Sequence, residues 1–223
     1  MLVFKGIDMS RKNELIAGVA SASALLATAA SAADLAAAAT SHEPAAASDW
    51  SGFYAGVSAG AFFGDVPTVY IDGEDSSYYT VQGVTPGVFV GFQEQADNGL
   101  VWGAEAAYFA GTDAGQGADG DSSDLSQYGL QGTIDVKLKA GMDMGGALVY
   151  GFAGVSAQEY LYSSESYVAL GANVGAGVEL KMTDHISLGL EYTHRFLQGF
   201  DQNNDEPTSV ANDTFALRAS YSF

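Results

Sequence analysis

The sequence contains no cysteine and few basic residues. Its 223 residues include 8 Lys and Arg against 27 Asp and Glu, a formal net charge of −19. The absence of cysteine excludes a disulfide scaffold and most thiolate chemistry. The shortage of bases argues against nucleic acid as a partner, because nucleic acid is bound through basic patches. A disordered chain is also excluded, since 48% of the residues are hydrophobic.

Residues 1–32 have the pattern of a cleaved signal peptide. Arg11 and Lys12 precede the apolar run LIAGVASASALLATAASA, which closes on an Ala-x-Ala site at Ala32. A positive region, an apolar region and a small-residue cleavage site predict export through the Sec pathway. The alternative is a membrane-anchor helix, for which the run is barely long enough and only weakly apolar. Met9 would make a more ordinary start of such a peptide.

Residues 33–49 are rich in alanine and lack periodicity, so we expect a flexible periplasmic tail before a folded domain at 50–223. From Trp50 onward, apolar residues alternate with small or polar ones. This two-residue period indicates strands. Eight segments carry it, near 53–63, 84–93, 100–110, 126–138, 147–157, 167–180, 186–196 and 214–223.

The phase of the alternation is clear in most segments and needs a choice in two. In 126–138 we place Leu130 on the same apolar face as Ile134. In 147–157 the phase is ambiguous, and we assign the apolar face to Leu148, Tyr150 and Phe152.

The connections between segments alternate in length. Short connections fall near 94–99, 139–146 and 181–185, and long ones near 64–82, 111–125, 159–166 and 197–213. No helical period intervenes. The chain is therefore expected to be all-β, an eight-stranded antiparallel up-and-down barrel with tight turns at one end and long loops at the other.

Alternation alone does not say which face points inward. A soluble, lipocalin-like barrel would place the apolar face inside and scatter charges outside. Here the polar face consists mainly of Gly, Ser, Thr and Gln, which suits a narrow interior. Its few charges are nearly balanced, as expected of buried charges that must pair in a lumenal network. These charges are Glu105, Asp135, Lys137, Glu179, Glu191, Arg195 and Arg218.

The aromatic residues favour the membrane alternative. They cluster near both ends of the segments and bound an aliphatic band, the pattern of membrane interfaces. The set comprises Phe53, Phe92, Trp102, Tyr108, Tyr128, Tyr167, Phe196 and Phe215. A closed barrel also pairs every backbone group that lipid would leave unpaired. Together with the signal peptide, this pattern predicts a transmembrane barrel with short periplasmic turns and long extracellular loops.

Two stretches resemble a known family. DWSGFYAGVSAG follows an ADL mature start, and ANVGAGVELKMTDHISLGLEYTHRFLQG has a Thr-Asp turn and a Glu-Tyr strand. Both are similar to the small outer-membrane β-barrel proteins of Gram-negative, especially alphaproteobacterial, cells, described as porin family or outer membrane protein beta-barrel domain and similar to the OmpA transmembrane domain. The resemblance covers about 50–223. It implies an envelope protein and does not establish a pore.

The four long connections hold 14 acids and no Lys or Arg. One interpretation is a solvated, repulsive crown that keeps the loops soluble. The other is divalent-cation binding, with loop carboxylates sharing cations with lipopolysaccharide phosphates. A weak cation site would lie in DAGQGADGDSSD, at Asp113, Asp119, Asp121 and Asp124, although the spacing matches no EF-hand.

Catalysis is not expected, because His194 is the only histidine near the outer rim and has no evident partner in sequence. No cofactor is expected either. We expect a structural outer-membrane barrel that supports envelope integrity, with a narrow channel for small solutes or ions as the alternative and a surface adhesin as the third. The expected partners are outer-membrane lipid, lipopolysaccharide, periplasmic chaperones and the barrel-assembly machinery. The family resemblance assigns the assembly signal to Tyr221 and the terminal Phe223.

Overall fold

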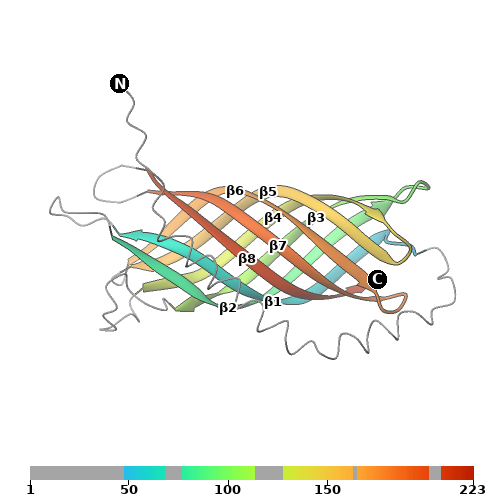
Figure 1. Ribbon diagram of the computed structural model, residues 1–223, viewed down its shortest axis with the longest axis horizontal. Coiled ribbons are helices and arrows are strands. Elements are labelled where there is room, and N and C mark those ends of the chain that lie inside the picture. Colours follow the sequence, from blue (N-terminus) through green and yellow to red (C-terminus); the bar gives the residue numbers. More distant parts are fainter. Residues whose placement is uncertain (1–47, 69–76, 114–127, 163–164, 201–206) are drawn as a thin grey trace, which may run out of the picture. The chain divides into compact units, whose positions relative to one another are not determined.

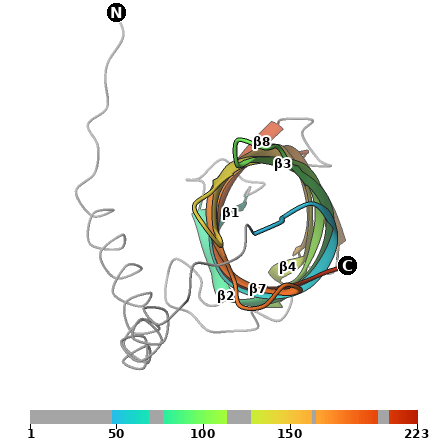
Figure 2. The ribbon, with the colours of Figure 1, turned by 90° about the vertical axis from the view of Figure 1, so that its right-hand side faces the viewer.

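In a computed structural model, eight β-strands form one closed barrel in which every strand pairs antiparallel with its neighbours in sequence, and β1 pairs with β8 (Figures 1 and 2). The structure describes residues 48–68, 77–113, 128–162, 165–200 and 207–223, without some side chains at the ends of these ranges. Within these ranges, no helix is long and apolar enough to span a membrane. The strands are β1 (Gly52–Thr68), β2 (Ser77–Gln95), β3 (Leu100–Asp113), β4 (Tyr128–Asp143), β5 (Ala147–Tyr162), β6 (Glu165–Lys181), β7 (Ile186–Phe200) and β8 (Pro207–Ser222).

The alternation in sequence becomes two faces of the barrel wall, because successive side chains of a strand point to opposite faces. Aliphatic side chains cover the outside: Val84, Leu138 and Leu217 each expose 60–71% of their surface. Polar and charged side chains point into the lumen, together with several aromatic and aliphatic ones and the inward-facing glycines. The all-β, eight-stranded antiparallel up-and-down barrel predicted from the sequence is confirmed.

The predicted phase of the fifth segment is wrong. Leu148, Tyr150 and Phe152 lie inside the barrel, and Val149 and Val155 face outward. Both faces of β5 are apolar near the short-turn end of the barrel, because its lumen contains an aromatic layer there. Apolarity alone therefore could not determine the phase.

Leu130 is also inside rather than outside, with 2% of its surface exposed. The register between β4 and β5 shifts between Leu130 and Gly132. Such an irregularity inserts one residue and reverses the side-chain phase on either side of it. Ile134, beyond the shift, faces outward as predicted.

The strands are longer than the sequence segments suggested, at 14–19 residues, whereas about 9–11 suffice to cross a bilayer. The added residues lie at the long-loop end. Five acids assigned to long connections belong to strands instead: Asp65, Asp113, Glu159, Glu165 and Asp213. The barrel wall therefore continues beyond the aliphatic band, and the outward side chains there include the exposed Gln82, Gln131 and Gln198.

Three tight hairpins mark one end, called here the turn end; the opposite end is the loop end. The hairpins are 96–99, 144–146 and 182–185. Gly99, Gly145 and Gly146 adopt positive φ angles, which a glycine accepts without steric cost. The carboxy-terminal residue also lies at the turn end, where the Phe223 N–H donates to the Phe53 carbonyl at 3.0 Å.

Candidate functional site

Among the residues that the structure describes, the lumen contains eight buried charged side chains, four acidic and four basic. Six belong to a central cluster, defined here as Glu105, Lys137, Lys139, Glu179, Glu191 and Arg218. The other two form an upper pair, Asp135 and Arg195, nearer the loop end. All seven residues that the sequence assigned to a lumenal network therefore lie in the lumen, and Lys139 joins them.

Glu105 on β3 lies at the middle of the central cluster. Its two carboxylate oxygens accept hydrogen bonds from Arg218 Nη1 and Nη2 at 2.9 and 2.5 Å. Lys137 Nζ and Lys139 Nζ approach the same carboxylate at 3.5 and 3.4 Å. The Tyr54 hydroxyl donates to Glu105 Oε2 at 2.9 Å. One carboxylate thus links β1, β3, β4 and β8 across the lumen.

The other two acids complete the central cluster. Glu191 receives Lys137 Nζ at 2.5 Å and Arg218 Nη1 at 2.7 Å, and the Tyr150 hydroxyl donates to it at 2.8 Å. Glu179 is held more loosely, with Lys139 Nζ at 3.3 Å and Arg218 Nε at 3.8 Å. Each of the three bases therefore faces at least two carboxylates.

The upper pair is a bidentate ion pair. Arg195 Nε and Nη2 donate to the two Asp135 oxygens at 3.0 and 2.6 Å, and the Ser156 hydroxyl donates to Asp135 at 2.6 Å. Arg195 Nη1 donates to Thr214 Oγ1 at 2.7 Å. A planar guanidinium matches a carboxylate well in this geometry. Within the described part of the chain, no salt bridge joins the upper pair to the central cluster.

Aromatic rings fill the space around these charges. The Arg218 guanidinium carbon lies 3.8 Å from the Phe89 ring centre, and Lys139 Nζ lies 4.1 Å from that of Tyr150. Rings of this size fit because inward glycines face them. A Cβ added at Gly56 would lie 2.3 Å from Phe89, and one at Gly177 would lie 2.5 Å from Tyr150. The glycines of the polar face thus make room for cation–π contacts.

Apolar clusters occupy the lumen on both sides of the charges. The cluster at the turn end comprises Trp50, Val101, Leu148, Tyr150 and Phe152. The cluster at the loop end comprises Phe62, Leu130, Tyr160, Ala169, Leu197 and Val210. In Figure 2 the first described residues (blue) lie across the opening of the barrel. Side chains therefore fill the lumen at three successive levels.

The turn-end opening holds residues expected to belong to a flexible tail. The Ser48 hydroxyl donates to Asp143 Oδ2 at 2.5 Å. The Ser51 N–H donates to Asp49 Oδ1 at 2.8 Å and thereby lowers the pKa of Asp49 below its ordinary value. Ser48 and Asp49 are thus part of the folded structure, whereas residues 33–47 lie outside the described ranges.

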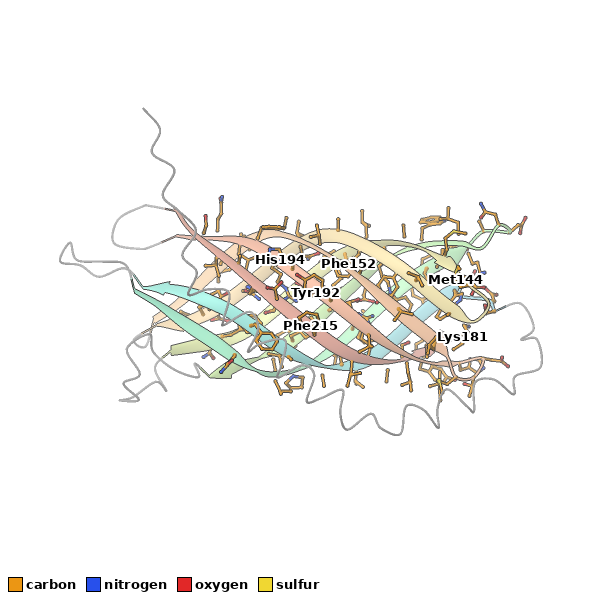
Figure 3. All side chains as sticks on the ribbon, viewed as in Figure 1. Met144, Phe152, Lys181, Tyr192, His194 and Phe215 are labelled. Carbon is orange, nitrogen blue, oxygen red and sulfur yellow. The ribbon has the colours of Figure 1, made fainter. Side chains whose placement is uncertain are left out.

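A second polar group lies on the outer surface of β7 and β8 (Figure 3). Asp213 Oδ1 lies 2.7 Å from His194 Nδ1 and accepts a hydrogen bond from the Tyr192 hydroxyl at 2.6 Å. The ring centres of Tyr192 and Phe215 are 4.9 Å apart. No partner for His194 was expected, because Asp213 was assigned to a loop. Both residues lie on paired strands, where they are opposite each other. Among the described residues, no serine, threonine or cysteine side chain forms a hydrogen bond with this group.

The remaining assigned residues fall into three sets. The outward-facing aromatics with more than a third of their surface exposed are Phe53, Phe92, Trp102, Tyr108, Phe196 and Phe215. Side chains outside the described set are those of Tyr128, Tyr167, Asp113, Asp119, Asp121 and Asp124. Tyr221 faces outward and stacks on His185, and Phe223 exposes 77% of its surface. Among the described residues, no group of three acids or histidines could hold a metal ion.

Three residues of the lumenal network were not predicted from the sequence: Lys139, Tyr54 and Tyr150. Lys139 was placed in a turn because its segment was ended one residue early. It follows Asp135 and Lys137 at the same two-residue spacing, so continuing the alternation would have found it. Tyr54 follows the outward-facing Phe53 by one residue, so the alternation would also have placed it inside. Tyr150 was assigned to the outward face because the phase of its segment was ambiguous.

Comparison with known proteins places the chain in a family. The sequence model of the family described as "Outer membrane protein beta-barrel domain" matches residues 20–223. A "22 kDa outer membrane protein" of Rhizobium leguminosarum bv. viciae is 32% identical over 165 residues, which cover 71% of this chain and 70% of the relative.

Solved structures agree in fold. Neisserial surface protein A aligns with a TM-score of 0.51 at 15% identity and covers 78% of this chain and 98% of its own. The outer membrane protein AlkL, solved in lipid bilayers, aligns with a TM-score of 0.51 at 12% identity and covers 82% of this chain and 94% of its own. Because outer-membrane barrels have short periplasmic turns and longer extracellular loops, the turn end is assigned to the periplasm and the loop end to the cell surface. The chain belongs to the outer membrane protein β-barrel family of Gram-negative bacteria.

Proposed function

We propose that this protein is a non-conducting structural barrel that supports the integrity of the outer membrane. The observation that carries the proposal is the filled lumen, in which four acids and four bases of the described strands pair between two apolar clusters. Water and solutes would need a continuous polar path, and the ion pairs tie opposite walls together instead. Separating these charges inside the barrel would leave each of them buried without a partner, which is costly, so the filled state is favoured.

Its biogenesis and partners follow from the same proposal. The signal peptide at residues 1–32 would direct Sec export, and periplasmic chaperones would deliver the chain to the barrel-assembly machinery. Tyr221 and Phe223 would form the carboxy-terminal assembly signal, and both are exposed at the barrel surface. Deleting Phe223 should lower the amount of heat-modifiable protein in outer-membrane fractions, and unchanged assembly would contradict this assignment.

The acidic crown is proposed to act at the cell surface. The extracellular connections between strands carry acids and no bases, so they would repel polyanions and share divalent cations with lipopolysaccharide. An adhesive role would need a receptor-specific feature in these loops. Catalysis is not proposed, because among the described residues the His194–Asp213 pair bonds to the Tyr192 hydroxyl and to no serine, threonine or cysteine side chain.

A narrow channel is the second candidate. The loose contacts of Lys139 with Glu105 and Glu179, at 3.4 and 3.3 Å, favour it, because a mobile ammonium could exchange partners. An exchange of this kind would open a path only if both apolar clusters also moved.

Two experiments separate these functions. A deletion strain should become sensitive to detergent and to chelators while small-solute uptake stays unchanged; wild-type resistance would refute the structural role. Purified protein in planar bilayers should show no single-channel steps. Clear steps that disappear in Glu191→Gln or Arg195→Met would establish the channel instead.

A further inference from the structure

Three residues outside the strands close the periplasmic mouth of the barrel. Ser48, Asp49 and Trp50 precede β1, which starts at Gly52, and none of them takes part in the β1–β2 or β1–β8 pairing. The barrel is therefore closed without them. We call residues 48–50 the strap, and the surface that they contact the seat.

Trp50 is the principal anchor of the strap. Only 2% of its surface is exposed, and it packs in one cluster with Val101, Leu148, Tyr150 and Phe152. Its backbone N–H donates to Gln95 Oε1 at 2.8 Å. Burial of an indole against side chains of β3 and β5 is the largest apolar contribution that a single residue can make to the contact.

Polar groups of the hairpins fix the rest of the strap. Asp143 Oδ2 accepts hydrogen bonds from Ser48 Oγ at 2.5 Å and from Gln95 Nε2 at 3.2 Å. The Gly146 N–H donates to Ser48 Oγ at 3.1 Å. Asp143 Oδ1 also receives the N–H groups of Gly145 and Gly146 at 3.1 and 3.0 Å. The same carboxylate thus orders the hairpin and holds the strap.

Lys181, at the end of β6, covers the strap from the other side. Its Nζ donates to the Asp49 carbonyl and lies 5.1 Å from the centre of the Trp50 ring. Figure 3 places Lys181 and Met144 near the same end of the barrel. The seat therefore offers an apolar pocket for an indole, an acceptor for a hydroxyl and a cation for a backbone carbonyl.

We propose that the periplasmic mouth is a binding site for a short peptide with the sequence Ser-Asp-Trp, filled in this protein by its own residues 48–50. Because the strap contributes no strand pairing, it can leave the seat while the barrel stays closed. Its release would expose the lower lumen up to the aromatic layer around Tyr150. The inference goes beyond the structural role and does not depend on it.

The test uses the absence of cysteine from the sequence. Leu148→Cys places one thiol in the seat beneath Trp50, where Leu148 is 1% exposed. A water-soluble maleimide should label this thiol roughly ten-fold faster or more when Trp50→Ala is added, because truncating a core Trp removes most of the buried contact. Equal labelling rates with and without Trp50→Ala would overturn the proposal.

Two controls keep the result specific to the strap. Met144→Cys lies in an exposed hairpin, so its labelling rate should not respond to Trp50→Ala. Trp102→Ala removes the lipid-facing tryptophan and should leave Leu148→Cys protected. Heat-modifiable gel mobility identifies variants that still form a barrel. If Trp102→Ala strongly raised the labelling rate of Leu148→Cys in folded protein, the barrel as a whole would be loosened, and the proposal would be overturned.

Binding in trans tests the peptide site itself. An amidated peptide of residues 46–52, AASDWSG, should slow labelling of the Leu148→Cys/Trp50→Ala protein, and the same peptide with Ala in place of Trp should not. Lack of protection by the Trp peptide would overturn the peptide-site assignment.

Tryptophan fluorescence gives a measurement that needs no cysteine. In the Trp102→Phe variant, the fluorescence of the remaining Trp50 should be quenched only weakly by acrylamide and by brominated lipid. With Trp50→Phe, brominated lipid should quench Trp102. Acrylamide quenching of Trp50 at the rate of an exposed indole would contradict the strap.

Discussion

The central cluster and the upper pair both neutralise buried charges inside the barrel, but they differ in how many partners each charge has. In the cluster, Glu105 has three basic neighbours and Arg218 has three acidic ones, so partners are shared. In the upper pair, Asp135 has Arg195 as its one salt-bridge partner among the described residues. When one charge of the cluster is removed, each of its partners keeps at least one other charge of opposite sign. The exclusive pair should therefore be the more sensitive of the two to a single substitution.

Arg195→Met should produce the largest effect. It leaves Asp135 buried, with 0% of its surface exposed, and with no basic partner among the described residues. Removing one member of a buried pair costs about 3–5 kcal/mol. We expect a decrease of this size in the free energy of unfolding, measured by urea titration in lipid vesicles with heat-modifiable mobility as the readout. A decrease below about 1 kcal/mol would show that the pair is not exclusive.

The double variant Arg195→Met/Asp135→Leu should recover most of that loss. Replacing a buried ion pair by apolar residues of similar volume is often neutral. We expect an unfolding free energy within about 2 kcal/mol of the wild type, because neither buried charge remains. A double variant as unstable as Arg195→Met would mean that packing or the contacts with Ser156 and Thr214 carry the effect.

The sequence predicted the wall of the barrel better than its interior. In β1, β3 and β7 the predicted alternation agrees with the structure. The side chains that face lipid must be apolar, so every second residue of these strands is constrained. The lumen imposes no such rule, since charged, polar and aromatic side chains all occur there. The phase of β5 was therefore open in the sequence, although Ser156 and Gln158 share the phase of Phe152 and point inward with it.

Other features depend on contacts between distant residues. The shift between Leu130 and Gly132 depends on how β4 meets β5, and no motif marks it. Ser48 reaches Asp143 across 95 positions of sequence. Its alanine-rich surroundings gave no sign of this contact. In contrast, charge balance indicated that the lumenal acids and bases would pair, because buried charges without partners are costly.

Lys139→Met should cause the smallest loss of stability of these single variants. Glu105 keeps two hydrogen bonds from Arg218 and the contact with Lys137, so it loses little. Glu179 retains only the 3.8 Å approach of Arg218 Nε as a salt bridge. We expect the free energy of unfolding to fall by about 1–2 kcal/mol, in the range of an unsatisfied buried hydrogen-bonding group.

The matched variant Lys139→Met/Glu179→Gln identifies the source of that loss. If the unpaired Glu179 carboxylate causes it, neutralising Glu179 should restore most of the stability in the same urea titration. A loss in Lys139→Met as large as that in Arg195→Met would contradict the sharing of partners in the central cluster. An unrestored double variant would instead assign the stabilising role of Lys139 to its contacts with the Tyr54 and Tyr150 rings, at 5.1 and 4.1 Å.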